Sequence, residues 1–304
     1  FLNKYIKYLF ATETLALGIN MPAKSIYIDR LHKYDGIKTR PLTQSEFLQL
    51  SGRAGRRGID DKGFAFLSYD KSVNREWYSN LFTLKPNDLI SAFSVNYSSI
   101  LNLLNIYNED EAVELLRKSF FAYQNMYKTD KLEKLFSAKY GVLNQLGFLN
   151  SDKGLVLTQT YRDNLIPAIY LFNKEKNKDI EFKLMYISSG ITNERAEFAL
   201  NDKFDSLLSS FNSSLELVNK TEVANGVGKP MKLNFSWFSV FYEYMKTSNI
   251  EYVINKFGLN IGDFIKVAKE ASELSKKLAV IYSDTEFEEI NDIFNNKLIQ
   301  KTMT

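Results

Sequence analysis

Cysteine is absent from this 304-residue chain, and histidine occurs once, as His32. These absences exclude disulfides and exclude metal clusters built from cysteine and histidine. His32 lies in RLHKYDG, and we interpret it as a loop residue and not as a catalytic base. Long apolar runs are missing too, since no segment approaches the roughly 18 residues of a membrane span. The first residues, FLNKYIKYLFATET, lack a signal-peptide pattern, so we expect a cytoplasmic protein with no membrane partner.

The bulk composition is that of packed globular protein, with 45% hydrophobic and 14% aromatic residues, which argues against wholesale disorder. The length allows two or three domains. The net charge of +3 is compatible with nucleic-acid binding but does not predict it, because the local arrangement of charge decides.

The first 85 residues predict an α/β arrangement. Thr43 and Glu46 form a capping box that opens a helix running to about Ala54. Three strands and one hairpin are also predicted, at residues 5–12, 24–31 and 63–69 and within 30–42. The order strand, loop, strand, helix, strand is typical of α/β folds, and it occupies too few residues to form a complete α/β domain.

From residue 86 onward the pattern predicts mainly helices. FLNSDKGLVLT, residues 148–158, predicts two short strands around a turn, and helices followed by such a hairpin indicate a winged helix. Thr285 and Glu288 predict a second capping box. Helical segments are expected at 87–107, 110–127, 132–146, 181–219, 234–246, 262–282 and 285–300. The fold class is thus α/β followed by mainly α, with a winged helix and a C-terminal helical bundle.

The stretch QLSGRAGRRGID, residues 49–60, holds three arginines and three glycines. On a helix that starts at Thr43, Gln49, Arg53 and Arg56 share one narrow sector at about 100° per residue. The opposite side, with Phe47, Leu50 and Ala54, is expected to be buried. Guanidinium groups bind phosphate oxygens in a bidentate manner, so a rigid helix with two of them predicts a phosphate clamp. A solvated basic helix face is an equally good interpretation of the helix alone.

ATETLALGINMPA, residues 11–23, together with QLSGRAGRRGID resembles motifs V and VI of superfamily 2 helicases. The resemblance is to the superkiller-type DExH RNA helicases, the branch that feeds RNA to the exosome. LISAFSVNYSSILNLLNI and ELLRKSFFAYQ are similar to the winged-helix region of that family, and GLNIGDFIKVAKEASELSKKL is similar to its ratchet helix. The resemblance implies three domains: the end of a second RecA-like lobe (1–85), a winged helix (86–165) and a helical ratchet domain (166–304).

The resemblance also implies which residues face the nucleotide and the RNA. ATP and Mg²⁺ would be the cofactors. Arg53 and Arg56 would reach the γ-phosphate, with Arg56 as the arginine finger, and Gln49 would contact the phosphates or the attacking water. The motif V residues implied to lie near the nucleotide are Gly18 and Asn20, and those implied to contact nucleic acid are Thr12 and Glu13. The plainer alternative is that these four residues only shape a loop and close a strand.

Two further sets are nucleic-acid candidates. Lys33, Tyr34 and Arg40 fall where the family has a hairpin at the duplex junction, although a plain surface hairpin is equally consistent. Lys266, Lys269 and Glu273 correspond to ratchet-helix positions that touch RNA, although a solvated charged face explains them as well. The same helix carries an apolar stripe that we expect to be core, formed by Phe264, Val267, Ala271, Leu274 and Leu278. Lys266 replaces the arginine usual there, which keeps the charge but loses planar stacking.

The chain departs from the family in lacking a phosphate-loop motif, a DExH box and the long arch found in eukaryotic members. We therefore expect the C-terminal part of a longer ATP-dependent RNA helicase, whose N-terminal RecA-like lobe holds most of the ATP and Mg²⁺ contacts. By resemblance it would move 3′ to 5′ on single-stranded RNA with a 3′ overhang and work with an exosome-like or other nuclease. Two alternatives are a DNA-repair helicase of the related branch and a nucleic-acid-binding remnant without motor activity.

Overall fold

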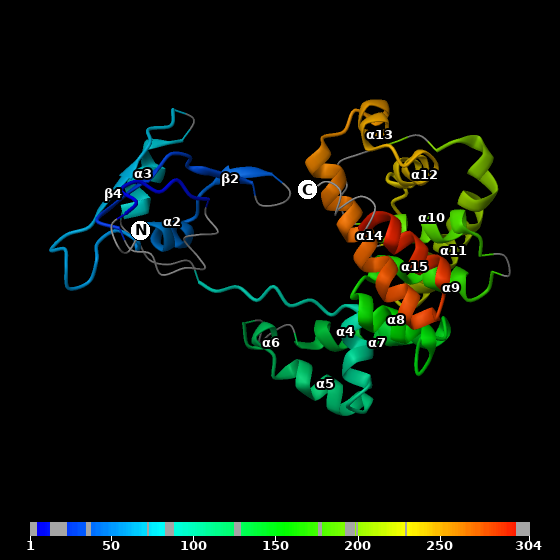
Figure 1. Ribbon diagram of the computed structural model, residues 1–304. Helices are drawn as coiled ribbons and strands as arrows, with labels where there is room; N and C mark the ends of the chain where they lie inside the picture. Colours follow the sequence, from blue (N-terminus) through cyan, green and yellow to red (C-terminus); the bar gives the residue numbers. More distant parts are fainter. Residues whose placement is uncertain are drawn as a thin grey trace. The chain divides into compact units, whose positions relative to one another are not determined.

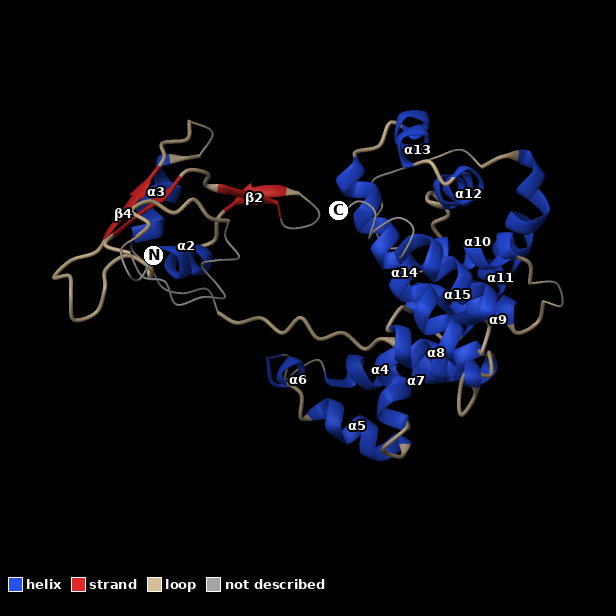
Figure 2. Cartoon of the chain, viewed as in Figure 1, coloured by secondary structure: helices blue, strands red, loops and turns tan. Residues whose placement is uncertain are grey.

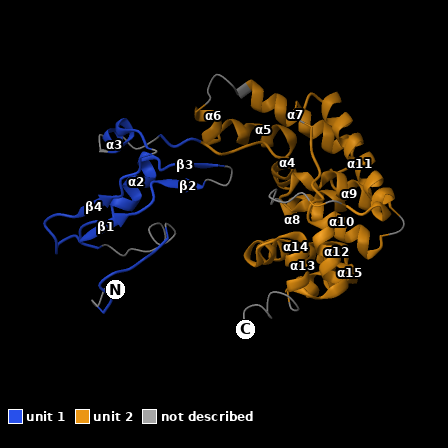
Figure 3. Cartoon of the chain, turned by 90° about the horizontal axis from the view of Figure 1, so that it is seen from above, with its two compact units in different colours: residues 1–90 blue, residues 91–304 orange. Residues whose placement is uncertain are grey.

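The computed structural model divides into two units, residues 1–90 and residues 91–304 (Figures 1 and 3). It describes residues 5–12, 23–34, 38–71, 73–82, 88–124, 129–175, 178–191, 198, 200–228 and 230–295. In the described part of the chain, all strands lie in the first unit, and the second unit is helical (Figure 2). The predicted α/β start and mainly helical remainder are confirmed at this level.

The first unit is built on a pair of parallel strands. Strand β1 (Ser25–Ile28) pairs with β4 (Phe64–Leu67), so that Ile28 lies opposite Leu67. Helices α2 (Gln44–Ser51) and α3 (Arg75–Phe82), together with Leu31 and Leu42, supply the rest of a small core. The buried members of this core are Ile28, Leu31, Leu42, Phe47 and Leu81.

The other face of this sheet is aromatic and open. Because side chains alternate along a strand, Tyr27, Phe64 and Phe66 share the face opposite Ile28. Tyr27 is 65% exposed, Phe64 46% and Phe66 55%. Parallel strands are normally covered on both faces, so this surface is unusual for its strand type.

A β-hairpin stands beside the sheet, as the sequence predicts for residues 30–42. Strands β2 (His32–Tyr34) and β3 (Thr39–Pro41) pair antiparallel, with Lys33 opposite Arg40. The backbone N–H of Leu42 donates to the carbonyl of Leu31 over 2.8 Å and closes the base of the hairpin. His32 therefore lies in a strand and not in a loop, and its Nδ1 is 3.1 Å from an Asp70 carboxylate oxygen.

The strand predicted at residues 5–12 is wrong. Every residue of that segment is exposed, and the segment takes no regular secondary structure. A strand needs a neighbour for its backbone hydrogen bonds, and none of the described strands pairs with this segment. The apolar residues of this segment suit a strand, but they do not show whether a neighbouring strand is there to pair with it.

The second unit is a helical assembly with one continuous core. Helix α10 (Ile180–Gly190) lies at its centre, since every residue from Phe182 to Gly190 is buried. The remaining helices are α4 (Tyr97–Leu104), α5 (Glu109–Arg117), α6 (Phe120–Gln124), α7 (Thr129–Gln145), α8 (Asp152–Thr160), α9 (Ile166–Phe172), α11 (Asp205–Ala224), α12 (Phe238–Thr247), α13 (Ile250–Phe257), α14 (Ile261–Tyr282) and α15 (Thr285–Asp292), with 3-10 turns η1 (Asp163–Leu165) and η2 (Asp202–Phe204).

The strand pair predicted within residues 148–158 is wrong, because most of that segment forms helix α8. Ser151 caps the helix by accepting a hydrogen bond from the N–H of Gly154, and Val156 and Leu157 are fully buried. Gly154 fits only because it has no side chain, since a Cβ there would lie 2.2 Å from the carbonyl oxygen of Phe148. A winged helix with a β-wing at this place is therefore not confirmed.

Two polar contacts, one of them buried, join helix α4 to later parts of this unit. The carboxylate of Asp163 caps α4 by accepting hydrogen bonds from the N–H groups of Tyr97 and Ser98, over 2.8 and 3.1 Å. The hydroxyl of Tyr97 donates to Glu222 on α11 over 2.7 Å, and burial raises the pKa of the Glu222 carboxyl. Separating α4 from α11 would break this buried hydrogen bond, so the contact stabilises the packing of the two helices.

Two predicted helix ends can be compared with the structure, and one of them is displaced by a residue. The predicted end of a helix at Gly147 is confirmed, since α7 ends at Gln145 and Gly147 takes a φ of 69°. The capping box predicted at Thr285 is wrong by one residue, because Asp284 is the N-cap and accepts from the N–H groups of Glu286 and Phe287. Within the described residues, no helix is both long and apolar enough to cross a bilayer, and no group of acidic and histidine side chains is arranged to hold a metal.

The packing of α8 gives a first test. Replacing Gly154 with alanine would improve helix propensity, yet the new Cβ meets the Phe148 carbonyl, so we expect a net loss of about 1–3 kcal/mol in the free energy of unfolding. Urea unfolding followed by the fluorescence of buried Trp237 measures it.

Gly262 is the matched control, because it also lies near the start of a helix, α14, and no heavy atom lies within 4 Å of an added Cβ. Gly262→Ala should leave stability unchanged or raise it by about 0.5–1 kcal/mol. Wild-type stability for Gly154→Ala would contradict the close approach of α8 to Phe148.

Candidate nucleotide and nucleic-acid site

Residues 52–63, which we call the arginine loop, leave helix α2 earlier than the sequence suggests. The helix ends at Ser51, Gly52 is its C-cap, and Gly55 takes a φ of 90°. The predicted helical sector shared by Gln49, Arg53 and Arg56 is therefore wrong. Only Gln49 lies on the helix, and the two arginines belong to the loop that follows it.

Sheet pairing explains why the chain leaves the helix. The N–H of Ala23, just before β1, donates to the carbonyl of Arg53 over 2.9 Å, and the N–H of Gly55 donates back to the Ala23 carbonyl over 2.7 Å. The returning end of the loop packs directly on this bridge: a Cβ on Gly63 would lie 2.4 Å from the backbone of Ala54. Glycine at 55 and at 63 thus lets the two ends of the arginine loop touch.

Arg56 is held by an acidic residue of its own loop. Its Nε donates to Oδ2 of Asp60 over 2.7 Å and its Nη2 to Oδ1 over 2.8 Å, while its backbone N–H also donates to Oδ2 over 3.0 Å. The guanidinium beside Asp60 lowers the pKa of that carboxyl to about 2. The Arg56 fork is therefore already oriented toward a bidentate oxygen acceptor.

The other residues of the stretch differ in exposure. Gln49 and Arg57 are exposed, while Arg53 is partly buried and offers its backbone carbonyl to Ala23. Phe47, predicted on the buried side of the helix, is 4% exposed. The buried side of α2 is thus as predicted at Phe47, and the position of the two arginines is not.

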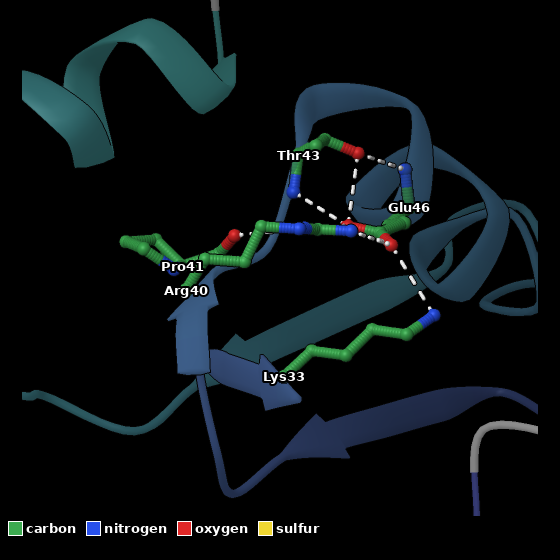
Figure 4. A network of polar contacts seen from close by, with 5 residues as sticks. All are labelled: Lys33, Arg40, Pro41, Thr43 and Glu46. Atoms are coloured by element: carbon green, nitrogen blue, oxygen red, sulfur yellow. Dashed lines mark hydrogen bonds and ion pairs between the residues drawn. The ribbon is translucent and has the colours of Figure 1, made fainter. Parts of the chain in front are cut away.

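A single carboxylate, Glu46, joins the hairpin to α2 (Figure 4). Arg40 donates from Nη1 and Nη2 to the two oxygens of Glu46 over 2.8 and 2.9 Å, and Lys33 Nζ lies 3.2 Å from Oε1. Thr43 donates from its backbone N–H over 2.8 Å and from its hydroxyl over 2.9 Å. The predicted capping box of Thr43 and Glu46 is confirmed.

These contacts hold the pKa of Glu46 far below its usual range, with the Arg40 hydrogen bonds as the largest cause. They also change the view of the hairpin candidates. Lys33 and Arg40 are not open cations on a bare hairpin, because each has a carboxylate partner in the helix. Tyr34 is 47% exposed and lies beside them on β2.

The motif V candidates can be placed only in part. Gly18, Asn20 and Glu13 lie outside the described residues. Thr12 is described, as an exposed residue at the end of the segment 5–12.

On α14, the apolar stripe predicted as core is confirmed, since Phe264, Val267, Ala271, Leu274 and Leu278 are buried. Lys266, Lys269 and Glu273 are exposed together on another side of the same helix. Glu270, between them, is tied to Arg162, whose Nη1 lies 2.7 Å from Oε1 of Glu270 and also donates to the carbonyl of Gly190. Glu270 therefore holds α14 to Arg162, whereas Lys266, Lys269 and Glu273 face the solvent.

Two residues with clear roles in this region escaped the sequence interpretation. Asp60 follows Arg56 by four residues, a spacing at which two opposite charges can form an ion pair. That spacing is the feature of the sequence from which the pair could have been predicted. Glu46 was recognised only as a helix cap, since nothing local in the sequence shows that Arg40 and Lys33 fold back onto it.

Comparison with known proteins agrees with the motif pattern. The chain is 42% identical over 120 residues to the exosome RNA helicase MTR4 of Homo sapiens, and 42% identical over 129 residues to the DExH-box ATP-dependent RNA helicase DExH9 of Arabidopsis thaliana. It is also 42% identical over 119 residues to the probable helicase HelY of Mycobacterium tuberculosis. The predicted resemblance to superkiller-type DExH RNA helicases is confirmed.

The matches cover 39–42% of this chain and 11–13% of each of these helicases, so the chain spans a small part of their length. No family model matches the chain.

The Glu46 network of the first unit is open to a direct test. Glu46→Gln keeps the shape and removes the charge, so we expect the first unit to lose roughly 1–3 kcal/mol of unfolding free energy at pH 7. Because the folded-state pKa is depressed, the contribution is complete above the ordinary glutamate pKa and declines as the pH falls below it. The difference between variant and wild type should therefore shrink between pH 7 and pH 3.5.

Trp77 on α3 reports on this unit, and a Trp237→Phe background removes the second of the two tryptophans. Glu76→Gln is the control: Glu76 is exposed on α3, and we expect a change within about 0.5 kcal/mol. A pH-independent effect of Glu46→Gln would show that shape and not charge explains the contact.

Proposed function

We propose that this chain is the C-terminal part of an ATP-dependent RNA helicase of the superkiller type. The complete protein would use ATP hydrolysis to move 3′ to 5′ along single-stranded RNA and unwind duplexes with a 3′ overhang, in RNA processing or decay. The observation that carries the proposal is the 42% identity over 120 residues to an exosome RNA helicase. The pre-oriented Arg56 fork in the arginine loop supports it.

In this proposal the arginine loop acts on the nucleotide. Arg56 is the arginine finger, Arg53 a second phosphate contact, and Gln49 a contact to the phosphates or the attacking water. The guanidinium of Arg56 fits such a role because it already binds two carboxylate oxygens side by side, as it would bind two phosphate oxygens. Asp60 would give up part of this pairing when Arg56 turns to a phosphate.

The remaining nucleotide contacts come from elsewhere. ATP with Mg²⁺ supplies the phosphoryl group that is transferred to water, and an N-terminal RecA-like lobe of the same protein would hold most of both. Gly18 and Asn20 of motif V are the candidates from this chain.

RNA would contact both units. On the first, the candidates are Thr12, Glu13, Lys33, Tyr34 and Arg40. On the second they are Lys266, Lys269 and Glu273, which share an exposed face of α14. Residues 86–165 and 166–304 would correspond to the winged-helix and ratchet domains, here with α8 where a β-wing was expected. A nuclease partner of the exosome kind and a cytoplasmic location complete the proposal.

The arginine finger gives a kinetic test in the full-length protein. Arg56→Ala removes charge stabilisation that is made only in the transition state, so RNA-stimulated kcat for ATP should fall by about 10³-fold or more. The Kd for single-stranded RNA should stay within a factor of about three. Steady-state phosphate release and fluorescence anisotropy measure the two quantities.

Arg57→Ala is the matched control, because Arg57 is the adjacent, exposed arginine of the same loop. Its kcat should remain close to wild type. Unchanged ATPase in Arg56→Ala would favour a binding remnant over a motor, and equal stimulation by single-stranded DNA would favour the DNA-repair alternative.

A further inference from the structure

Tyr161, at the end of α8, has a backbone conformation that does not suit its side chain. Its φ of 54° and ψ of 32° lie in the left-handed region. That region costs free energy for any residue with a Cβ, and helices that end in it usually place a glycine there. The other described non-glycine residues with a positive φ are Asn150, Ser248 and Ser283, all small and polar. The way in which α8 ends therefore does not explain a large aromatic residue at this position.

Packing does not explain the tyrosine either. Tyr161 is 69% exposed. Its backbone N–H donates to the carbonyl of Leu157 over 3.0 Å, a bond that any residue except proline could make. Among the described residues, its hydroxyl forms no hydrogen bond and its ring contacts no other ring or cation. An open aromatic ring on a costly backbone conformation is a feature that a ligand would explain.

Two contacts hold this end of α8 against α14. On one side of Tyr161, the carbonyl of Gln159 accepts a hydrogen bond from Nζ of Lys277 over 3.2 Å. On the other side, Nη1 of Arg162 lies 2.7 Å from Oε1 of Glu270. Figures 1 and 3 both show α8 beside α14. Because Tyr161 lies between the two contacts, it is fixed beside the stretch of α14 that they enclose.

The exposed face of α14 is basic. Its exposed charged residues are four lysines and one glutamate: Lys266, Lys269, Glu273, Lys276 and Lys277. Lysine is depleted in interfaces between proteins, whereas a row of cations with an aromatic ring beside it is the usual surface for single-stranded nucleic acid. The charge of this face therefore favours a polyanion over a protein partner.

The order of residues along α14 indicates how a strand would lie. Lys266 precedes Glu270 by about one turn, and Glu273 precedes Lys277 by about one turn, so these four residues follow the same edge of the helix. Glu273 thus falls between the two contacts that flank Tyr161. A carboxylate repels phosphates and accepts hydrogen bonds from bases, so the bases of the strand would face this edge.

We propose that Tyr161 stacks on a base of single-stranded RNA that lies along α14. Lys266 and Lys269 would neutralise the phosphates of the same strand, and Glu273 would accept a hydrogen bond from a base. The tyrosine would supply the planar stacking surface that a lysine at position 266 does not provide. This inference rests on the proposed function, since it takes RNA as the ligand.

Tyr161→Gly in the full-length protein separates a binding role from a structural one. Glycine suits the left-handed backbone, so the melting temperature should stay the same or rise. The Kd for single-stranded RNA should rise by about 5- to 100-fold, because a stacked base is lost. Tyr161→Phe keeps the ring and should bind as wild type does. Fluorescence anisotropy with a fluorescein-labelled 12-nucleotide RNA of mixed sequence, together with thermal unfolding, measures both quantities.

The salt dependence of binding distinguishes stacking from charge. Stacking releases no counterions, so between 50 and 200 mM KCl the plot of log K against log salt for Tyr161→Gly should run parallel to that of wild type. Lys266→Ala removes a phosphate contact and should flatten the slope by about 0.7 for a single strand.

Tyr123→Ala is the matched control, because Tyr123 is exposed to a similar extent, 71%, and lies on α6. If wild type binds RNA and Tyr161→Gly binds as well as this control, the stacking proposal is wrong. It is also wrong if Tyr161→Gly lowers the melting temperature together with the affinity, or if Tyr161→Phe binds as weakly as Tyr161→Gly. If the wild-type protein binds no single-stranded RNA at all, the proposed function itself fails.

Discussion

The carboxylate of Glu46 is the contact on which the first unit depends. It accepts hydrogen bonds from the start of its own helix and from Arg40, and it pairs with Lys33, so that the hairpin and α2 form one body. A partly buried charge of this kind is stable only when its neighbours are complete, which makes the three partners interdependent. Any motion of the hairpin would therefore be transmitted to the helix that leads into the arginine loop.

The arginine loop itself combines a rigid frame with an exchangeable contact. The frame is backbone: the Ala23 bridge and the close approach of Gly63 to Ala54 leave little room for movement. The exchangeable contact is the pair of Arg56 and Asp60, which is partly open to solvent. Under the proposed function, a fixed backbone with a replaceable side-chain partner would suit an arginine that meets a phosphate at one step of a cycle.

Local chemistry explains what could be predicted from the sequence and packing explains what could not. The cap at Thr43, the hairpin, the end of α7 and the apolar stripe of α14 each depend on residues close together in the chain, and each is confirmed. The segment 5–12 and the residues of α8 have compositions that suit either a strand or a helix, so neighbours distant in sequence decide their form.

The candidate site shows the same limit more sharply. The residue types of the arginine stretch indicated the kind of site, but the sequence did not predict where the side chains lie. Backbone hydrogen bonds with Ala23 hold the residues after Gly52 outside the helix. Helix α13, which lies between two predicted helices, was missed altogether.

The aromatic face of the β1–β4 sheet has a practical consequence for work with the isolated chain. Tyr27, Phe64 and Phe66 present a flat, uncharged surface next to strand edges. Exposed apolar surfaces of this kind bind one another and bind hydrophobic dyes. We therefore expect these three rings to contribute to the tendency of a purified sample to associate as its concentration rises.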